Sequence, residues 1–588
     1  MPLTSPVSSS VMLTHPAVSP PAGRTEHCYG GPVPRDHHFA DLVFTGGPVY
    51  TVDPARSWAR AVAVRDGRIV AVGADHDVRH LIGARTEVVD LAGKLLLPGF
   101  QDAHVHPVLG GVTMRSCDLH HLETAQAYQD AVAAYAAAEP DRAWITGGGW
   151  SMEAFPGGTP HRELLDAVVP DRPVALPNRD GHGVWANSRA LEIAGITRDT
   201  PDPADGRIER DADGLPTGML QEGAADLVTR HIPATGEDDF RQGLIEGQRY
   251  LHGFGITGWQ DAGVGSAFGP GDVYGAYLAA AADGSLTARV RAAQWWDRQG
   301  GLEQLHEFTA RRAEAAAVRD GAGRFRAGTV KMMLDGVAEN HTAAMLEPYL
   351  DGCGCSSGSS GLDFIDPEKL GGHVSELDAE GFQVHFHALG DRAVRSALDA
   401  VEEALRRNGP RGNRHHLAHL QVVHPEDVPR FRQLGATANM QPLWACHEPQ
   451  MDELTIPFLG ERRSGWQYPF GSLARSGAML AAGSDWSVST PDVMLGIHVA
   501  VNRRAPGEQD VRVLGPQERL DLGTALAAYT AGSARVNHLD DVTGSVQTGK
   551  YADLVVLDRD PFAGPAEAIG ETRVLRTYVE GDLVHAAQ

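Results

Sequence analysis

Two histidines one residue apart, His104 and His106, are the first residues whose types and spacing indicate chemistry. They close an apolar run that passes through Pro98-Gly99 and reads as a short strand. In a β-strand, side chains two residues apart point to the same face, so both imidazoles can reach one metal ion. With 27 histidines in 588 residues, chance alone yields roughly one such pair. The pair therefore predicts a metal site only if further ligands arrive from other elements.

The elements that must position these ligands alternate between strand-like and helical runs, the pattern of a parallel α/β fold. Eight runs predict the strands of one (β/α)8 TIM barrel: 99–106, 256–261, 290–296, 329–334, 383–388, 415–419, 437–441 and 479–485. About 150 residues separate the first run from the second, too many for an ordinary connection. We therefore expect a large insertion after the first strand, with residues 110–250 forming a cap within a barrel domain of residues 99–539.

Both ends of the chain are rich in short β-runs joined by Asp-Gly and Gly turns, which are typical of hairpins. We expect residues 39–98 and 540–588 to form one small β-sandwich domain built from both terminal regions. Residues 1–38 are rich in Pro, Ser, Gly and Thr and carry no periodic pattern, which predicts a disordered tail.

Composition excludes several classes of partner. A formal charge of −25 argues against nucleic acid and anionic membrane surfaces, both of which favour Lys and Arg. No apolar run approaches the length of a membrane span, and the N-terminus does not read as a signal peptide. Five cysteines are too few and too irregular for a disulfide framework. We expect a cytoplasmic protein that acts on a small-molecule substrate, and a homodimer is left open.

Chemistry-bearing residues gather where the barrel strands end, the location of catalytic groups in this fold. They come from five strands: His104 and His106, Lys331, His385 and His387, His419, and Asp485. A single histidine at a strand end is more often structural than a ligand, but five strands converging on one rim favour a shared metal site. Lys331 is also unusual, because the chain contains only four lysines and this one lies inside an apolar strand.

The order of these residues along the chain resembles that of the amidohydrolase superfamily. The sequence segments around them resemble its YtcJ-like branch, the family-3 amidohydrolases that include N-substituted formamide deformylases. The resemblance covers about residues 40–585. The matching segments are Leu97-Pro98-Gly99-Phe100-Gln101-Asp102-Ala103-His104-Val105-His106, Arg179-Asp180-Gly181-His182, Val330-Lys331-Met332-Met333-Leu334-Asp335-Gly336, His385-Phe386-His387-Ala388-Leu389-Gly390-Asp391 and Gly483-Ser484-Asp485-Trp486-Ser487-Val488. One departure is Ala418 before His419, where the family usually has an acidic residue.

The resemblance implies a role for each residue of the rim. His104 and His106 would bind one divalent ion, with zinc expected, together with Asp485. His387 and His419 would bind a second ion, and a carboxylated Lys331 would bridge the two. The alternative is one ion beside an unmodified lysine. His385 faces the same way as His387 and is kept as an alternative or supporting ligand.

The same resemblance implies a metal-dependent hydrolase of carbon–nitrogen bonds other than peptide bonds, acting on amides or N-substituted formamides. Asp485 would be the catalytic base and then the acid. His182, Trp185 and Glu222 of the insertion are candidates to line the substrate pocket, as is His385. A deaminase or cyclic-amide hydrolase is the alternative, since the same metal cage activates water for all three. A catalytically silent regulatory relative is less favoured, because the ligand set is complete.

Overall fold

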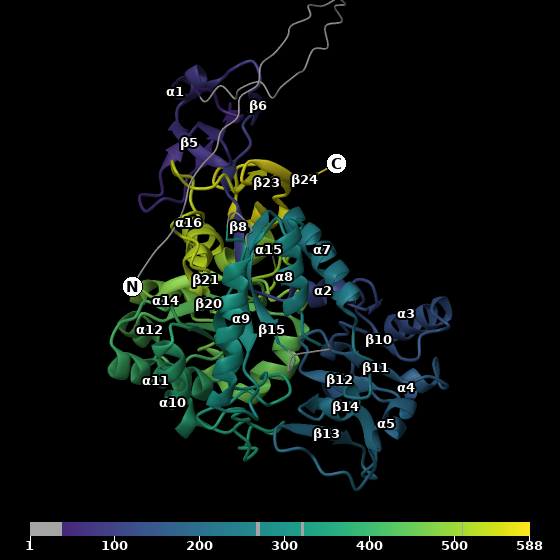
Figure 1. The fold of residues 1–588 in the computed structure, drawn as a ribbon. Coiled ribbons are helices and arrows are strands. Elements are labelled where there is room, and N and C mark those ends of the chain that lie inside the picture. The colour runs from purple at the N-terminus through teal and green to yellow at the C-terminus, as the bar shows by residue number, and fades with distance from the viewer. Residues whose placement is uncertain (1–37, 266–270, 319–322, 509, 588) are drawn as a thin grey trace, which may run out of the picture. The chain divides into compact units, whose positions relative to one another are not determined.

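Eight parallel strands form the central sheet of the protein, seen in a computed structural model that describes residues 38–265, 271–318, 323–508 and 510–587 (Figure 1). Their order in the sheet follows their order in the chain. The strands are β8 (Phe100–Val105), β15 (Ile256–Val264), β16 (Arg289–Trp295), β17 (Phe325–Met333), β18 (Gln383–Ala388), β19 (His416–His419), β20 (Thr437–Met440) and β21 (Met479–Ala482).

The sheet closes where its first and last strands meet. The backbone N–H of Asp485, three residues beyond β21, donates to the carbonyl of His104 at 2.8 Å, and the N–H of His106 donates to the carbonyl of Trp486 at 2.8 Å. All eight predicted runs lie in this sheet, which confirms the (β/α)8 barrel. The predicted tail of residues 1–38 falls outside the described residues except for His38.

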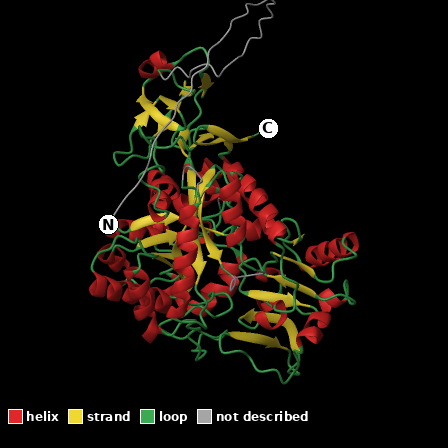
Figure 2. Ribbon diagram, viewed as in Figure 1, coloured by secondary structure: helices red, strands yellow, loops and turns green. Residues whose placement is uncertain are grey.

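Helices connect successive strands and surround the sheet, as the red and yellow ribbons of Figure 2 show. In α11 (Asp391–Asn408), the buried residues Ala393, Val394, Ala397, Leu398 and Val401 recur at helical spacing, so one apolar stripe faces the barrel. The other helices around the barrel are α2 (Pro107–Thr113), α7 (Glu237–Gly253), α8 (Tyr274–Asp283), α9 (Leu305–Ala317), α10 (Pro367–Ala379), α12 (Val428–Leu434), α13 (Ile456–Ser464), α14 (Phe470–Ser476), α15 (Val493–Asn502), α16 (Leu522–Ala527) and α17 (Ser533–Val536).

The two ends of the chain form a β-sandwich, as predicted, with purple and yellow strands together in Figure 1. One sheet has the order β5-β4-β1-β6, and the other has the order β24-β23-β22-β7-β2-β3. Their shared apolar core includes Phe44, Leu96 and Tyr578. The strands are β1 (Leu42–Thr45), β2 (Val49–Tyr50), β3 (Trp58–Ala59), β4 (Ala61–Arg65), β5 (Arg68–Gly73), β6 (Glu87–Asp90), β7 (Leu96–Pro98), β22 (Leu554–Leu557), β23 (Val574–Val579) and β24 (Asp582–Ala586).

Gly99 carries the chain from this sandwich into the barrel, between β7 and β8. Its N–H donates to the carbonyl of Asp553 at 2.8 Å, and a Cβ here would lie 2.5 Å from the side chain of Thr257. Only glycine permits so close an approach at this crossing.

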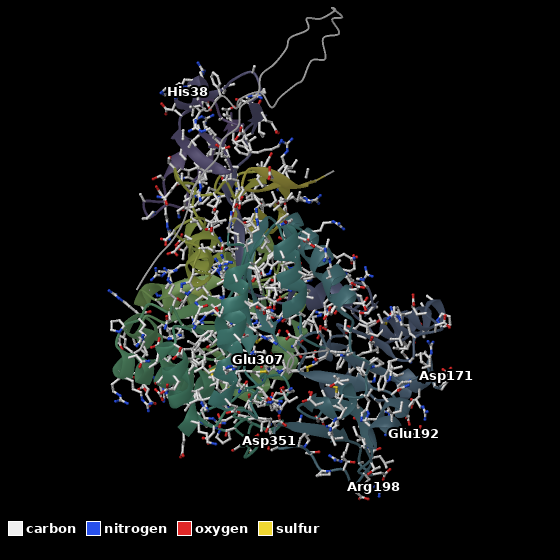
Figure 3. All side chains as sticks on the ribbon, in the orientation of Figure 1. His38, Asp171, Glu192, Arg198, Glu307 and Asp351 are labelled. Atoms are coloured by element: carbon white, nitrogen blue, oxygen red, sulfur yellow. The ribbon has the colours of Figure 1, made fainter. Side chains whose placement is uncertain are left out.

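The segment between β8 and β15 folds around its own sheet, of order β13-β14-β12-β11-β10-β9, which confirms the large insertion. Charged residues such as Asp171, Glu192 and Arg198 are exposed on the insertion (Figure 3). The elements are β9 (Cys117–Asp118), β10 (Ile145–Gly148), β11 (Val174–Pro177), β12 (Gly183–Ala186), β13 (Gly206–Arg210), β14 (Pro216–Glu222), α3 (Ala125–Ala138), α4 (Glu163–Asp166), α5 (Ser188–Ala194) and α6 (Asp226–Thr229).

The predicted domain boundaries stay predictions, and the end of the cap at residue 250 falls within α7. That helix packs against α2, where a Cβ on Gly111 would lie 1.9 Å from the carbonyl oxygen of Gly243. Among the helices of the described residues, none combines the length and apolar character needed to cross a membrane.

Candidate metal centre

The predicted rim residues stand at the carboxyl ends of the barrel strands. His104 lies near the end of β8 with His106 just beyond it, Lys331 lies on β17, and His387 lies on β18. His419 ends β19. His419 and Asp485 have φ values of 78° and 56°, a left-handed conformation that is uncommon for residues other than glycine. Such strain persists where the surrounding structure enforces it, and it clusters at functional sites.

Three of these side chains form a group that can hold one cation: His104, His106 and Asp485, whose ligand atoms lie within 4.8 Å of one another. The Nε2 atoms of the two histidines lie 3.4 and 3.3 Å from Oδ1 of Asp485. Lys331 Nζ is 3.4 Å from His104 Nε2. Lys331 and Asp485 therefore both approach the same ring nitrogen of His104, Nε2.

His387 and His419 adjoin this group. Their ring centroids are 4.4 Å apart, and the ring of His419 lies 4.6 Å from that of His104. Nε2 of His387, both ring nitrogens of His419 and Oδ1 of Asp485 are buried without a hydrogen-bond partner among the described residues. Each such atom costs roughly 1–3 kcal/mol. Lone pairs left this way on imidazole and carboxylate suit a divalent cation, so the residues fit the metal that the sequence predicts.

The pKa shifts of these groups favour the protonation states in which they can bind a metal ion. Burial lowers the pKa values of His104 and His387 well below the ordinary range and that of His419 to about 3, so the imidazoles are neutral. Burial also lowers the pKa of Lys331 to about 7. Burial alone would raise the pKa of Asp485, but the neighbouring His106, His419 and Lys331 lower it.

His385 has a different environment from His387, although both face the barrel interior. Its Nε2 lies 2.9 Å from Nδ1 of His104, and its Nδ1 lies 2.7 Å from Oε1 of Gln260. Both ring nitrogens are thus engaged behind His104, whereas Nε2 of His387 has no partner in the described part of the chain. This contrast favours His387 over His385 as the ligand from β18.

The insertion brings His182 and Glu222 to the same region. The ring of His182 lies 5.4 Å from that of His387, and its Nδ1 is 3.0 Å from each oxygen of Glu222. Burial alone would lower the pKa of His182, but the charge of Glu222 raises it to about 9. Glu222 also accepts hydrogen bonds from Thr342 at 2.6 Å and Asn340 at 3.2 Å, which lie beyond β17.

Trp185 lies elsewhere. It is fully buried in the core of the insertion, where its ring contacts Phe155 at 5.2 Å and Trp150 at 6.0 Å. Its indole N–H donates to the carbonyl of His161 at 3.2 Å. We therefore leave Trp185 out of the proposed substrate site.

Sequence reasoning missed several supporting residues: Asp102, Gln260, Asn340, Thr342 and His416. Asp102 belongs to the segment that ends in His106, and Gln260 lies inside a predicted strand, so the sequence does predict which strand carries each of them. Their side-chain partners come from other strands and from residues distant in the sequence. A single sequence does not reveal such pairing.

Comparison with known proteins agrees with this geometry. The model of the amidohydrolase family matches residues 87–585. The chain belongs to the amidohydrolase family. The predicted enzyme class, a metal-dependent hydrolase of carbon–nitrogen bonds, is confirmed at this level.

Three curated relatives cover 92% of this chain each. The putative amidohydrolase YtcJ of Bacillus subtilis (strain 168) is 30% identical, with 99% of its length covered. The N-substituted formamide deformylase of Arthrobacter pascens is 28% identical, with 98% covered. Protein LONG AFTER FAR-RED 3 of Arabidopsis thaliana is 32% identical, with 91% covered, and its name states no reaction. The predicted resemblance to the YtcJ-like branch is confirmed.

Among solved structures, an uncharacterized metal-dependent hydrolase from Pyrococcus furiosus superposes with a TM-score of 0.67 at 25% identity. The match covers 88% of this chain and 99% of that one. The similarity therefore extends over most of this chain.

Proposed function

We propose that the protein hydrolyses the amide carbon–nitrogen bond of small molecules at divalent metal ions, with N-substituted formamides as the first substrate class to test. The observation that carries the proposal is the set of partnerless ligand atoms on His387, His419 and Asp485, next to His104 and His106. His104, His106 and Asp485 would hold one ion, and His387 and His419 a second.

The donor set is rich in neutral imidazole, which suits zinc. A divalent ion bound by this set supplies Lewis acidity, which activates water for attack and polarises the substrate carbonyl. Asp485 would accept the proton of the attacking water and deliver it to the leaving amine nitrogen.

Lys331 would bridge the two ions as a carbamate. Because burial lowers its pKa to about 7, a large fraction of the amine is neutral near pH 7. A neutral amine adds to CO₂ and releases one proton, which leaves an anion with two oxygens. The alternative, one ion beside an unmodified lysine, is decided by the number of ions bound per chain.

His182 would contact the substrate from the insertion. Its Nδ1 is held by Glu222, which leaves Nε2 for the oxygen of the substrate carbonyl. The charge of Glu222 keeps the ring protonated at neutral pH. Nε2 therefore donates where negative charge develops during attack on the carbonyl.

The formamide deformylase of Arthrobacter pascens, 28% identical over nearly its whole length, supports formamides as the first choice. Metal analysis of the purified protein, combined with a hydrolysis panel of formamides, other amides, cyclic amides and aminopurines, tests the proposal. We expect bound zinc and release of formate from N-substituted formamides. Turnover of cyclic amides or aminopurines alone would replace the substrate class, while a metal-free protein that added zinc does not activate would overturn the proposal.

A further inference from the structure

We propose that a chain of hydrogen bonds inside the barrel, from Gln383 through Gln260 and His385, fixes which ring nitrogen His104 offers to a metal ion. The inference rests on the proposed metal centre and identifies positioning residues for it. All three side chains are at most 1% exposed. We call this chain of hydrogen bonds the relay. Gln383, His385 and His387 occupy alternate positions of β18, so the first and last members of the relay and a proposed metal ligand share one face of the strand.

The chain begins at two backbone carbonyls. Nε2 of Gln383 donates to the carbonyl of Arg414 at 2.8 Å and to that of Val536 at 2.9 Å. A carbonyl oxygen only accepts, so the amide nitrogen of Gln383 must face these two groups. Its Oε1 then faces the barrel interior, where the hydroxyl of Thr329 donates to it at 2.8 Å.

Gln260 takes its orientation from Gln383. Its Nε2 lies 3.1 Å from Oε1 of Gln383, and because that oxygen only accepts, the Gln260 nitrogen is the donor. Oε1 of Gln260 therefore faces two imidazoles, with His385 Nδ1 at 2.7 Å and His416 Nε2 at 3.0 Å. Both of these ring nitrogens must carry a proton.

An independent anchor gives the same result for His416. Nδ2 of Asn439 donates to the carbonyl of Ala103 at 2.9 Å, which orients its amide. The same Nδ2 lies 3.2 Å from Nδ1 of His416. That ring nitrogen is therefore an acceptor, and the ring proton sits on Nε2, as the Gln260 contact requires. Every polar atom of the relay has a compatible partner, the condition for a buried polar network to stabilise one arrangement.

The last step reaches the metal group. The ring nitrogens of His385 bond to an amide oxygen and to His104, with no carboxylate at either, so the buried ring holds one proton, on Nδ1. Its Nε2 accepts from Nδ1 of His104 at 2.9 Å. The lone pair of His104 is thereby confined to Nε2, the atom 3.4 Å from both Asp485 Oδ1 and Lys331 Nζ. A histidine without this partner would spend part of its time with the proton on Nε2, where it blocks coordination.

The substitution Gln260→Leu tests the relay, because it removes the acceptor while keeping an uncharged side chain of similar size. Gln294→Leu is the matched control: Gln294 is also fully buried, lies on the adjacent strand β16, and donates to two backbone carbonyls at 3.1 and 3.0 Å. Zn²⁺ affinity is measured by competition with a chelator, and the stability of the metal-free proteins by urea unfolding. We expect both variants to lose similar stability, but only Gln260→Leu to bind Zn²⁺ about 10–100-fold more weakly.

A rescue experiment uses His385 itself. His385→Leu removes the acceptor for His104 Nδ1, whereas the amide oxygen of His385→Gln can replace it. We expect the glutamine variant to recover most of the Zn²⁺ affinity that the leucine variant loses, and this pair decides the question if Gln260→Leu does not fold. Equal affinity in Gln260→Leu and Gln294→Leu, or in the two His385 variants, overturns the relay alone. Failure of the wild-type protein to bind Zn²⁺ overturns the metal centre and the relay with it.

Discussion

Asp102 on β8 accepts hydrogen bonds from the backbone N–H of Ser484 at 3.0 Å and from its hydroxyl at 2.6 Å, across the seam where the barrel closes. The other carboxylate oxygen accepts the backbone N–H of His104 at 2.9 Å. One buried carboxylate thus holds the backbone at His104 and at the residue before Asp485. The separation of these two proposed ligands depends on it.

We predict that Asp102→Asn weakens metal binding about 10–100-fold, because an amide nitrogen then faces backbone N–H groups that need an acceptor. The variant should also lose about 1–3 kcal/mol of stability. Ser484→Ala, which removes only the hydroxyl, is the control and should retain near-normal affinity. Metal content and chelator competition provide the measurement, and unchanged affinity in Asp102→Asn would contradict the positioning role.

Lys331→Met tests the bridge, since methionine keeps an unbranched apolar chain without the amine. We expect fewer metal ions per chain and at least about a 100-fold loss of activity, because the second ion loses its shared anion. Reconstitution of the metal-free wild-type protein should also be faster with added bicarbonate, whereas that of Lys331→Met should not respond. Two ions and full activity in the variant would show that no carbamate forms.

A feature of this fold could be predicted from the sequence where the residues that indicate it lie close together in the chain. The barrel strands could be predicted because each carries an apolar run within a few residues, and the rim residues because each ends such a run. Gln260 and His416 could not be predicted, since a buried glutamine or histidine inside a strand is ordinary core until its partner is known. Their partners lie on other strands, and only the register of the closed sheet brings them together.

Trp185 shows the converse difficulty. An aromatic residue near a motif suggests a pocket, but the same side chain stabilises a core, and the sequence does not distinguish the two. In the structure, the insertion has a core of its own, in which the ring of Trp185 contacts those of Trp150 and Phe155.

Arg289 joins the barrel to the terminal sandwich and should matter for stability. This side chain, 1% exposed, forms ion pairs with Asp553 and Glu580, each at 2.7 Å. Arg289→Met leaves Asp553 buried without its partner, for which we expect a loss of about 3–5 kcal/mol in urea unfolding. The control Arg559→Met breaks an exposed pair with Glu571 and should change stability by less than about 1 kcal/mol. Equal effects of the two substitutions would contradict this assignment.

The pair of His182 and Glu222 predicts a pH dependence of stability. Burial opposes charge on His182, but Glu222 raises its folded-state pKa to about 9, above the ordinary value of 6.5. Its contribution is therefore complete below pH 6.5 and is lost as pH rises toward 9, because only the folded state holds the proton in that window. The limiting slope is about −1.4 kcal/mol per pH unit.

Glu222→Gln removes the charge that raises the pKa of His182. The stability of the variant should therefore not fall with this slope between pH 6.5 and 9, and at pH 6.5 the variant should be less stable than the wild-type protein. Urea unfolding of both proteins at several pH values, with chelator present throughout, measures the difference and cancels the contributions of other groups. Parallel stability curves across this window would mean that His182 is neutral in the folded protein. In that case the ring could not act as a cationic donor to a substrate carbonyl.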